Sequence, residues 1–171
     1  MTKRPKALAA WASIPRDIRS AIAGLSSRDR KSRGGSEGWS IQEYAHHLVE
    51  ANLVASNIIL AALGRPGCTY DWSWVIPDRR WMKRLGYDKV PLEPAIKLLE
   101  SLCGHVVGIA RGAPGSMNRS VRLLDSPGAR LRRRTVRQVL DDECKHARHH
   151  LRDIADTRSA PGRLRKRRKS G

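Results

Sequence analysis

The sequence predicts an all-α fold, a four-helix bundle with long connections between its helices. Four segments repeat apolar residues at intervals of three and four, the spacing that places side chains on one helix face. Almost no segment alternates apolar and polar residues as a half-buried strand would. The chain has 171 residues, which suits one such bundle because domains of about 100 to 200 residues are usual.

The first two helical segments have recognisable boundaries. The first spans residues 7–25 and contains Pro15, which should kink the helix or divide it in two. The second spans residues 41–63. Ser40 precedes it and Glu43 follows three residues later, which is the capping-box pattern of a helix start. We therefore expect the second helix to begin near residue 41.

The third and fourth helical segments span residues 92–110 and 136–155. Gly and Pro clusters follow the second and third segments and should end those helices. These clusters lie at residues 64–67 and 112–115. Thr135 is the expected N-cap of the fourth helix, with Gln138 in the reciprocal position. The long connections between the helices span residues 26–38, 68–91 and 116–134.

The charge is strongly basic, with 34 Lys and Arg against 16 Asp and Glu and a formal net charge of +18. Since 40% of the residues are hydrophobic, the chain can still bury a core, and the excess charge belongs to its surface. Residues 163–169 are almost all cationic and follow Pro161 and Gly162. We expect a bundle over residues 1–158 and a disordered basic tail over residues 159–171.

Composition excludes several classes of protein. The apolar runs are interrupted, for example by Glu50 and Asn52, so no membrane-spanning segment and no membrane partner are expected. Cys68, Cys103 and Cys144 are odd in number and widely spaced, which argues against a disulfide framework or a zinc ribbon. Reduced cysteines and a cytoplasmic location are the simpler expectation.

Helix periodicity sorts the histidines by direction. On the second helix His47 lies at the flank of the apolar stripe, whereas His46 lies opposite that stripe. On the fourth helix His146 and His150 flank the stripe and are four residues apart, which stacks their rings on one face. His149 points toward solvent. Two helices can thus present three imidazoles at the edge of one core.

Three imidazoles are a ligand set for a divalent metal ion such as zinc, nickel, copper or iron(II), with a coordination position left for water or substrate. The plainer interpretation of the His146 and His150 pair is two polar-edge residues that hydrogen bond to neighbours. Spacing alone leaves both interpretations open.

Two motifs resemble a known family. Residues 39–48 (WSIQEYAHHL) are similar to the entry into the second helix of the DinB/YfiT-like superfamily. Residues 135–140 (TVRQVL), followed by residues 146–154 (HARHHLRDI), are similar to its last motif, a helix with H-x-x-x-H. The resemblance implies a four-helix bundle in which His47, His146 and His150 bind a divalent metal ion of zinc, nickel or iron type.

The resemblance also implies a range of activities. Characterised relatives include metal-dependent transferases that use low-molecular-weight thiols, such as mycothiol or bacillithiol, so a thiol S-transferase or a hydrolase acting on a small molecule is expected. Relatives often form homodimers. Basic residues at the mouth of the site, such as Arg79, Arg80 or Arg148, are candidates to hold an anionic cosubstrate.

Two further features have competing interpretations. One connection is rich in tryptophan and contains Trp72, Trp74 and Trp81. It could form a lid over the metal or a stacking surface for bases. We favour a third interpretation, in which its aromatic side chains plug the end of the bundle. Asp153 is a candidate to orient a ligand histidine, or else a solvated carboxylate.

The alternative function is a noncatalytic basic module. Residues 130–134 and the tail would then dock to nucleic acid through phosphate contacts. No motif of a known nucleic-acid-binding domain supports it.

Overall fold

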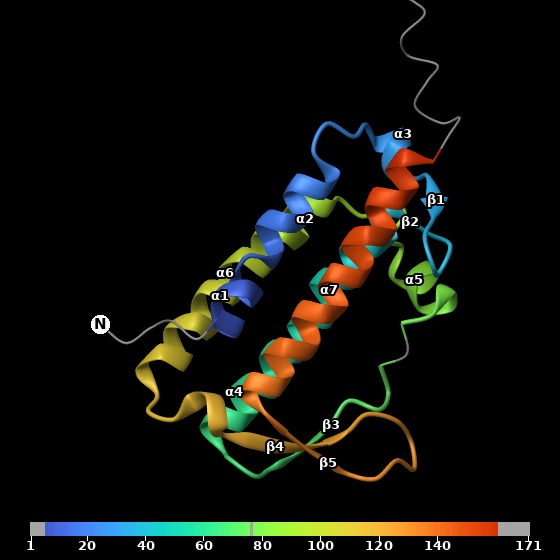
Figure 1. Ribbon diagram of the computed structural model, residues 1–171. Helices are drawn as coiled ribbons and strands as arrows, with labels where there is room; N and C mark the ends of the chain where they lie inside the picture. Colours follow the sequence, from blue (N-terminus) through green and yellow to red (C-terminus); the bar gives the residue numbers. More distant parts are fainter. Residues whose placement is uncertain (1–5, 76, 161–171) are drawn as a thin grey trace, which may run out of the picture.

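The bundle is built from three long helices and one helix divided in two, within residues 6–75 and 77–160, the part of the chain that this computed structural model describes. The long helices are α4 (Ile41–Gly64), α6 (Leu92–Gly112) and α7 (Val136–Ser159). The fourth position is shared by α1 (Lys6–Ala12) and α2 (Ile14–Ile22), which pack against α6 and α7 (Figure 1). The predicted all-α four-helix bundle is confirmed.

The helix boundaries follow the local signals in the sequence. The Ser40 hydroxyl accepts a hydrogen bond from the Glu43 backbone N–H at 3.1 Å, and Glu43 accepts one in return from the Ser40 backbone N–H at 2.7 Å. Thr135 and Gln138 form the same reciprocal pair at the start of α7. Pro15 lies in the first turn of α2, where a missing N–H costs nothing, so it divides the predicted first helix in two.

The connections contain more regular structure than expected. β1 (Arg33–Gly34) pairs antiparallel with β2 (Trp39–Ser40). In a second sheet, β4 (Ser120–Leu124) pairs parallel with β3 (Thr69–Asp71) and antiparallel with β5 (Arg132–Thr135). The sequence did not predict these strands, because strands of two to five residues are too short to show a period. The connections also hold the short helices α3 (Ser27–Arg30), α5 (Arg79–Leu85) and the 3₁₀ turn η1 (Ser116–Asn118).

α4 is the core helix of the bundle, packed against both α6 and α7. Its length and hydropathy would also suit a membrane span, but 56% of its most apolar window is buried inside the bundle, as expected for a core helix. Asn52 on α4 is completely buried and accepts a hydrogen bond from the Trp11 indole N–H at 2.7 Å, which ties α1 to α4. Cys103 and Cys144 are buried, and Cys68 is half-buried.

The two sheets lie at opposite ends of the bundle (Figure 1). The β1–β2 hairpin and α3 lie near the start of α4 and the end of α7, whereas the three-stranded sheet crosses the other end. α7 ends at Ser159, close to the predicted boundary at residue 158. The predicted basic tail falls almost entirely within residues 161–171, which lie outside the described residues.

Candidate metal centre

Three histidines from two neighbouring helices converge at one point. His47 comes from α4, and His146 and His150 come from successive turns of α7. The Nε2 atoms of His47 and His146 lie 3.0 Å apart, and one ring nitrogen from each of the three lies within 4.8 Å of the others. His47 and His150 are buried and His146 is half-buried. The structure thus brings together the three side chains that periodicity had sorted inward.

Aromatic rings enclose the cluster on one side. The ring centroid of Trp39, on β2, lies 5.1 Å from that of His47 and 5.7 Å from that of His150. The Tyr44 ring lies 5.3 Å from His150. Because these rings are buried, they limit the access of water and hold the two imidazoles in fixed orientations.

A carboxylate fixes the orientation of His150. Nδ1 of His150 lies 3.0 Å from Oδ2 of Asp153, which is buried. An ionised carboxylate only accepts, so Nδ1 carries the proton and Nε2 keeps its lone pair. Asp153 also accepts hydrogen bonds from the backbone N–H and the hydroxyl of Ser36. Asp153 is therefore placed to orient His150, which is one of the two interpretations that the sequence left open for this residue.

Gly35 lets the β1–β2 loop come close enough to make these contacts. It has a φ of +70°, and a Cβ there would lie 2.6 Å from the Tyr44 hydroxyl and 2.7 Å from Asp153 Cβ. Both the positive φ and the lack of space for a Cβ therefore require glycine at this position. Sequence reasoning missed Gly35 and Ser36, because their link to the site spans more than a hundred residues.

His47 and His150 are held in the neutral state that metal binding requires. Burial, with the positive charges that His146 and His150 can carry, lowers the pKa of His47 to about 3. Burial also lowers the pKa of His150, although Asp153 opposes the shift. Burial would raise the pKa of Asp153, but hydrogen bonds from Ser36 and His150 outweigh it and lower that pKa. Neutral side chains of His47 and His150 near an ionised Asp153 are the expected result at neutral pH.

The donor set fits a divalent ion of zinc, nickel or iron type. Two imidazole nitrogens bound at about 2.1 Å to one ion, at an angle of roughly 90 to 110°, lie about 3.0 to 3.4 Å apart. The 3.0 Å between the two Nε2 atoms meets this spacing. A second group, His149 with His150 and Asp153, also has ligand atoms close together, but its His149 is exposed and its Asp153 oxygens already accept hydrogen bonds.

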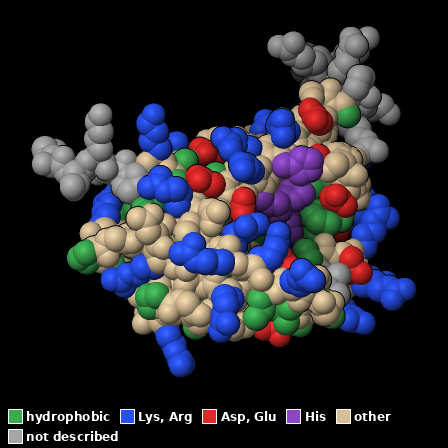
Figure 2. Space-filling view, turned by 60° about the horizontal axis from the view of Figure 1, so that its bottom comes forward, with side chains coloured by type: hydrophobic (Ala, Val, Ile, Leu, Met, Phe, Trp, Pro, Cys, Tyr) green, Lys and Arg blue, Asp and Glu red, His purple; other side chains and the backbone are tan. Residues whose placement is uncertain are grey.

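A cavity of about 370 Å³ opens from the histidines and runs between α4 and α7. Its residues come from both helices, the three-stranded sheet and the connection before α5. They include His47, Glu50, Val54, Ile58, Trp72, Val75, Pro77, Leu123, Arg132, Arg134, Val139, Glu143 and His146. Histidine side chains reach the surface at one place on this side of the molecule, with acidic side chains beside them (Figure 2).

Two glutamates at the histidine end were missed by sequence reasoning. Glu50 Oε1 accepts a hydrogen bond from the Trp81 indole N–H at 2.7 Å, whereas its Oε2 is buried without a partner in the described residues. Burial raises the pKa of Glu50. Glu143 Oε2 lies 3.5 Å from Nδ1 of His146. Both glutamates are three residues from a site histidine, and that helical spacing could have revealed them.

The structure corrects the expectation for His46. It is buried, stacks on Tyr87 with ring centroids 4.7 Å apart, and lies 3.1 Å from the Val90 carbonyl oxygen. The segment after α5 covers the helix face that periodicity assigned to solvent. His149 is exposed, as expected.

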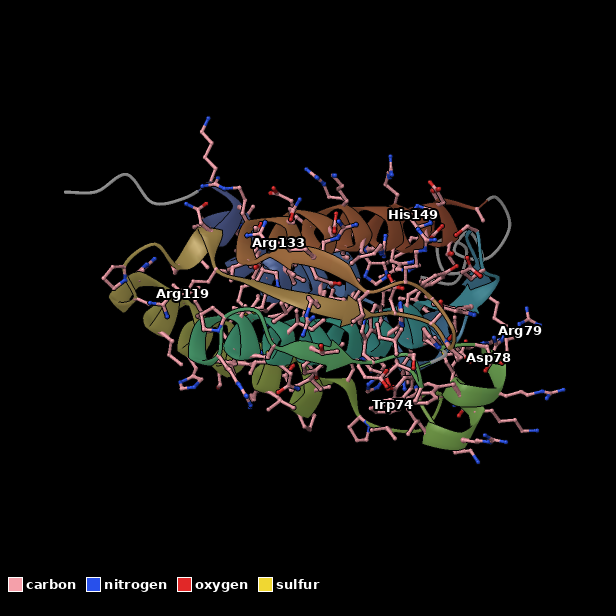
Figure 3. The ribbon with its side chains drawn as sticks, turned by 90° about the horizontal axis from the view of Figure 1, so that it is seen from below. Trp74, Asp78, Arg79, Arg119, Arg133 and His149 are labelled. Carbon is pink, nitrogen blue, oxygen red and sulfur yellow. The ribbon has the colours of Figure 1, made fainter. Side chains whose placement is uncertain are left out.

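Part of the tryptophan-rich connection packs against the core and also lines the cavity. Trp72 lines the cavity and Trp81 bonds to Glu50, while Trp74 is 67% exposed. Trp74 and Asp78 lie in this connection, away from Arg119 (Figure 3).

The cations expected at the mouth lie elsewhere. Arg79 and Arg80 line a shallow depression beside Trp39, and Arg148 lines a separate small cavity next to Cys144. Arg132 and Arg134 are the arginines that line the histidine cavity, within the described residues.

Two bacterial proteins have similar sequences, whereas no family model matches the chain. A protein of Geobacillus kaustophilus named "Putative metal-dependent hydrolase" is 25% identical over 158 residues, which cover 91% of this chain and 84% of that protein. A protein of Geobacillus thermodenitrificans with the same description is 30% identical over 97 residues, 56% of this chain and 52% of its own length.

A solved structure has the same fold. YfiT from Bacillus subtilis, described as "a probable metal-dependent hydrolase with an unusual four-helix bundle topology", aligns with a TM-score of 0.75 at 14% identity. The alignment covers 92% of this chain and 89% of YfiT. Together with the two relatives, this likeness confirms the resemblance of the chain to the DinB/YfiT-like superfamily.

Proposed function

We propose that this protein binds one divalent metal ion through His47, His146 and His150 and catalyses a metal-dependent hydrolysis. The observation that carries the proposal is the convergence of three buried or half-buried imidazoles, with two Nε2 atoms 3.0 Å apart, at one end of a cavity. The hydrolase descriptions of the relatives and of YfiT support the same reaction class.

Residues around the histidines have separate tasks in this proposal. A bound divalent ion would supply Lewis acidity and would make a water more acidic. Asp153 holds His150 in the tautomer that leaves Nε2 free. Glu50 lines the cavity together with His47 and His146, so its carboxyl group can accept a proton from water and return it to a leaving group. Its raised pKa suits that exchange.

Hydrolysis is preferred here to thiol transfer because the described residues around the histidines supply a carboxyl group suited to moving a proton of water. A thiol S-transferase would use the same three histidines with a thiol as the nucleophile. Assays with a small ester or amide, with and without an added low-molecular-weight thiol, separate the two reactions. Turnover that requires the thiol would replace hydrolysis with transfer.

Metal analysis tests the metal site directly. Wild-type protein purified without chelators should hold close to one equivalent of divalent metal by elemental mass spectrometry. His47→Ala, His146→Ala and His150→Ala should each lower that content severely, and the triple variant should abolish it. His105→Ala is the matched control, since it removes an exposed histidine of α6 that belongs to neither group of possible ligands. Metal-free wild type, or a triple variant that keeps its metal, would refute the site.

The outer face of the three-stranded sheet favours a second candidate function. Arg122 and Arg133 are cross-strand partners and both are exposed, and like charges placed opposite each other destabilise a sheet unless anions neutralise them. The proposal is that this face and the basic tail bind the phosphates of nucleic acid. Duplex binding at two salt concentrations, with and without residues 163–171, tests it. Absence of binding at low salt would remove this candidate.

A further inference from the structure

The three consecutive arginines of β5 point to two sides of the sheet. Arg132 is paired with Leu123 and Arg134 with Val121, and both apolar partners are buried. Cross-strand partners point to the same face, so Arg132 and Arg134 face the bundle. Arg133 faces outward, opposite the exposed Arg122. The alternation of side chains along β5 therefore places the consecutive arginines 132–134 on two faces of the sheet, so they do not form one continuous surface for nucleic acid.

The two inward arginines line the same cavity as the histidines and have N–H groups to spare. Arg134 is 28% exposed, and its Nε lies 3.7 Å from Asp142 Oδ2, beyond hydrogen-bond distance. Its side chain donates no hydrogen bond within residues 6–75 and 77–160. Arg132 bonds through Nη2 to Asp125. A guanidinium has five N–H donors, so both groups can still bind an oxyanion.

The arginines and the histidines line neighbouring parts of the cavity. His47 lies in the second turn of α4, whereas Ile58 lies eleven residues further along, toward the end where the sheet crosses (Figure 1). That stretch of α4 is about 16 Å long, whereas Asp142, which lies beside Arg134, precedes His146 by four residues of α7, or about 6 Å. The wall along this stretch is largely apolar, from Val54, Ile58 and Val139. A molecule that fills the cavity thus contacts apolar side chains as well as the arginines and the histidines.

Carboxylates lie beside both the arginines and the histidines. Asp125 and Asp142 lie beside the arginines and hold them at the cavity, whereas Glu50 and Glu143 lie at the histidine end. The guanidinium N–H groups that Asp125 and Asp142 leave unused are therefore the groups in this cavity that can attract an anionic head.

We propose that the cavity binds a molecule with an apolar body and a carboxylate head, with the head held by Arg132 and Arg134. The bond to be hydrolysed then lies at the histidines, and this last part alone rests on the function proposed above. The arginines set which molecules bind, and the apolar wall sets the length of the body.

Direct calorimetric titration with octanoate and with octanol tests the proposal, because the two ligands share a chain and differ in the charged head. Wild type should bind octanoate more tightly than octanol. Arg134→Gln and Arg132→Gln should each weaken octanoate binding about tenfold, as expected for a lost charge-assisted hydrogen bond, and should leave octanol binding unchanged. Arg133→Gln is the matched control, with the same loss of charge one residue away on the opposite face.

Each outcome decides the proposal. No octanoate binding by wild type, equal binding of octanol, or an equal loss in Arg133→Gln would overturn it. The same titration with the chelator-treated triple variant His47→Ala, His146→Ala, His150→Ala separates it from the metal hypothesis. Arginine-dependent octanoate binding should persist there even if the wild type holds no metal, whereas its disappearance would show that the metal, and not the arginines, holds the carboxylate. Circular dichroism confirms that each variant is folded.

Discussion

Asp153 and His150 are joined by a contact of 3.0 Å between Oδ2 and Nδ1, one helical turn apart on α7, and both residues are buried. The contact decides which nitrogen of His150 is free. It also links the histidine cluster to the β1–β2 loop, because the same carboxylate accepts two hydrogen bonds from Ser36. Orientation of the site therefore depends on a loop far away in the sequence.

Asp153→Ala should weaken metal binding by about 10- to 100-fold, since a ligand histidine loses the partner that fixes its tautomer and ring orientation. Competition with a chromophoric chelator measures the affinity. Asp156→Ala, which removes an exposed carboxylate from the same helix, should leave the affinity unchanged. Equal affinities of wild type and Asp153→Ala would show that this carboxylate does not support a metal ligand.

Gly35→Ala should destabilise the protein more than Gly24→Ala. Both glycines have φ near +70°, so an alanine at either position costs about 1 to 2 kcal/mol of backbone strain. A Cβ at Gly24 meets nothing within 4 Å, whereas one at Gly35 meets Tyr44 and Asp153 below 3 Å. The clash should add about 1 to 3 kcal/mol to the loss of unfolding free energy in urea. Similar losses in the two variants would contradict the close approach described here.

The metal-free protein should lose stability as the pH falls below about 6.5. Burial holds the pKa of His47 at about 3 in the folded state and lowers that of His150, against a usual value near 6.5. At a pH between the folded and unfolded pKa values, the unfolded chain binds more protons than the folded chain does, so acidification favours unfolding. Each neutral buried histidine contributes a slope of about 1.4 kcal/mol per pH unit.

Urea titrations between pH 6.5 and 5.0, above the range where most carboxylates protonate, measure this slope. His47→Gln should reduce this slope by the contribution of one histidine, about 1.4 kcal/mol per pH unit. A slope that His47→Gln leaves unchanged would mean that His47 is not held neutral by the fold.

Asn52→Ala should cost about 1 to 3 kcal/mol of unfolding free energy, because the fully buried Trp11 indole N–H would lose its acceptor. Asn57→Ala is the control. Each of these asparagines donates a hydrogen bond to the carbonyl oxygen four residues earlier. Asn57 is exposed, so its replacement should cost no more than about 0.5 kcal/mol. Thermal or urea unfolding of both variants tests the comparison, and equal losses would count against the Trp11 bond.

Much of the bundle and of the histidine cluster could be predicted because the signals are local. The capping pairs Ser40 with Glu43 and Thr135 with Gln138 set helix starts within one turn of chain. Once those helices form, their period alone determines that His146 and His150 lie on one face. The fold class and the inward direction of three histidines therefore follow from the sequence itself.

Tertiary structure decided what depends on distant partners. His46 is buried because Tyr87 packs on it, and no period within α4 contains that information. The arginines of β5 divide between two faces only because β4 pairs with them in a particular register. Asp153 meets Ser36 because Gly35 leaves room for the loop. Helix periodicity depends on the sequence of one segment alone. Burial and strand register each depend on two segments that pack or pair, so they are determined only when the whole chain has folded.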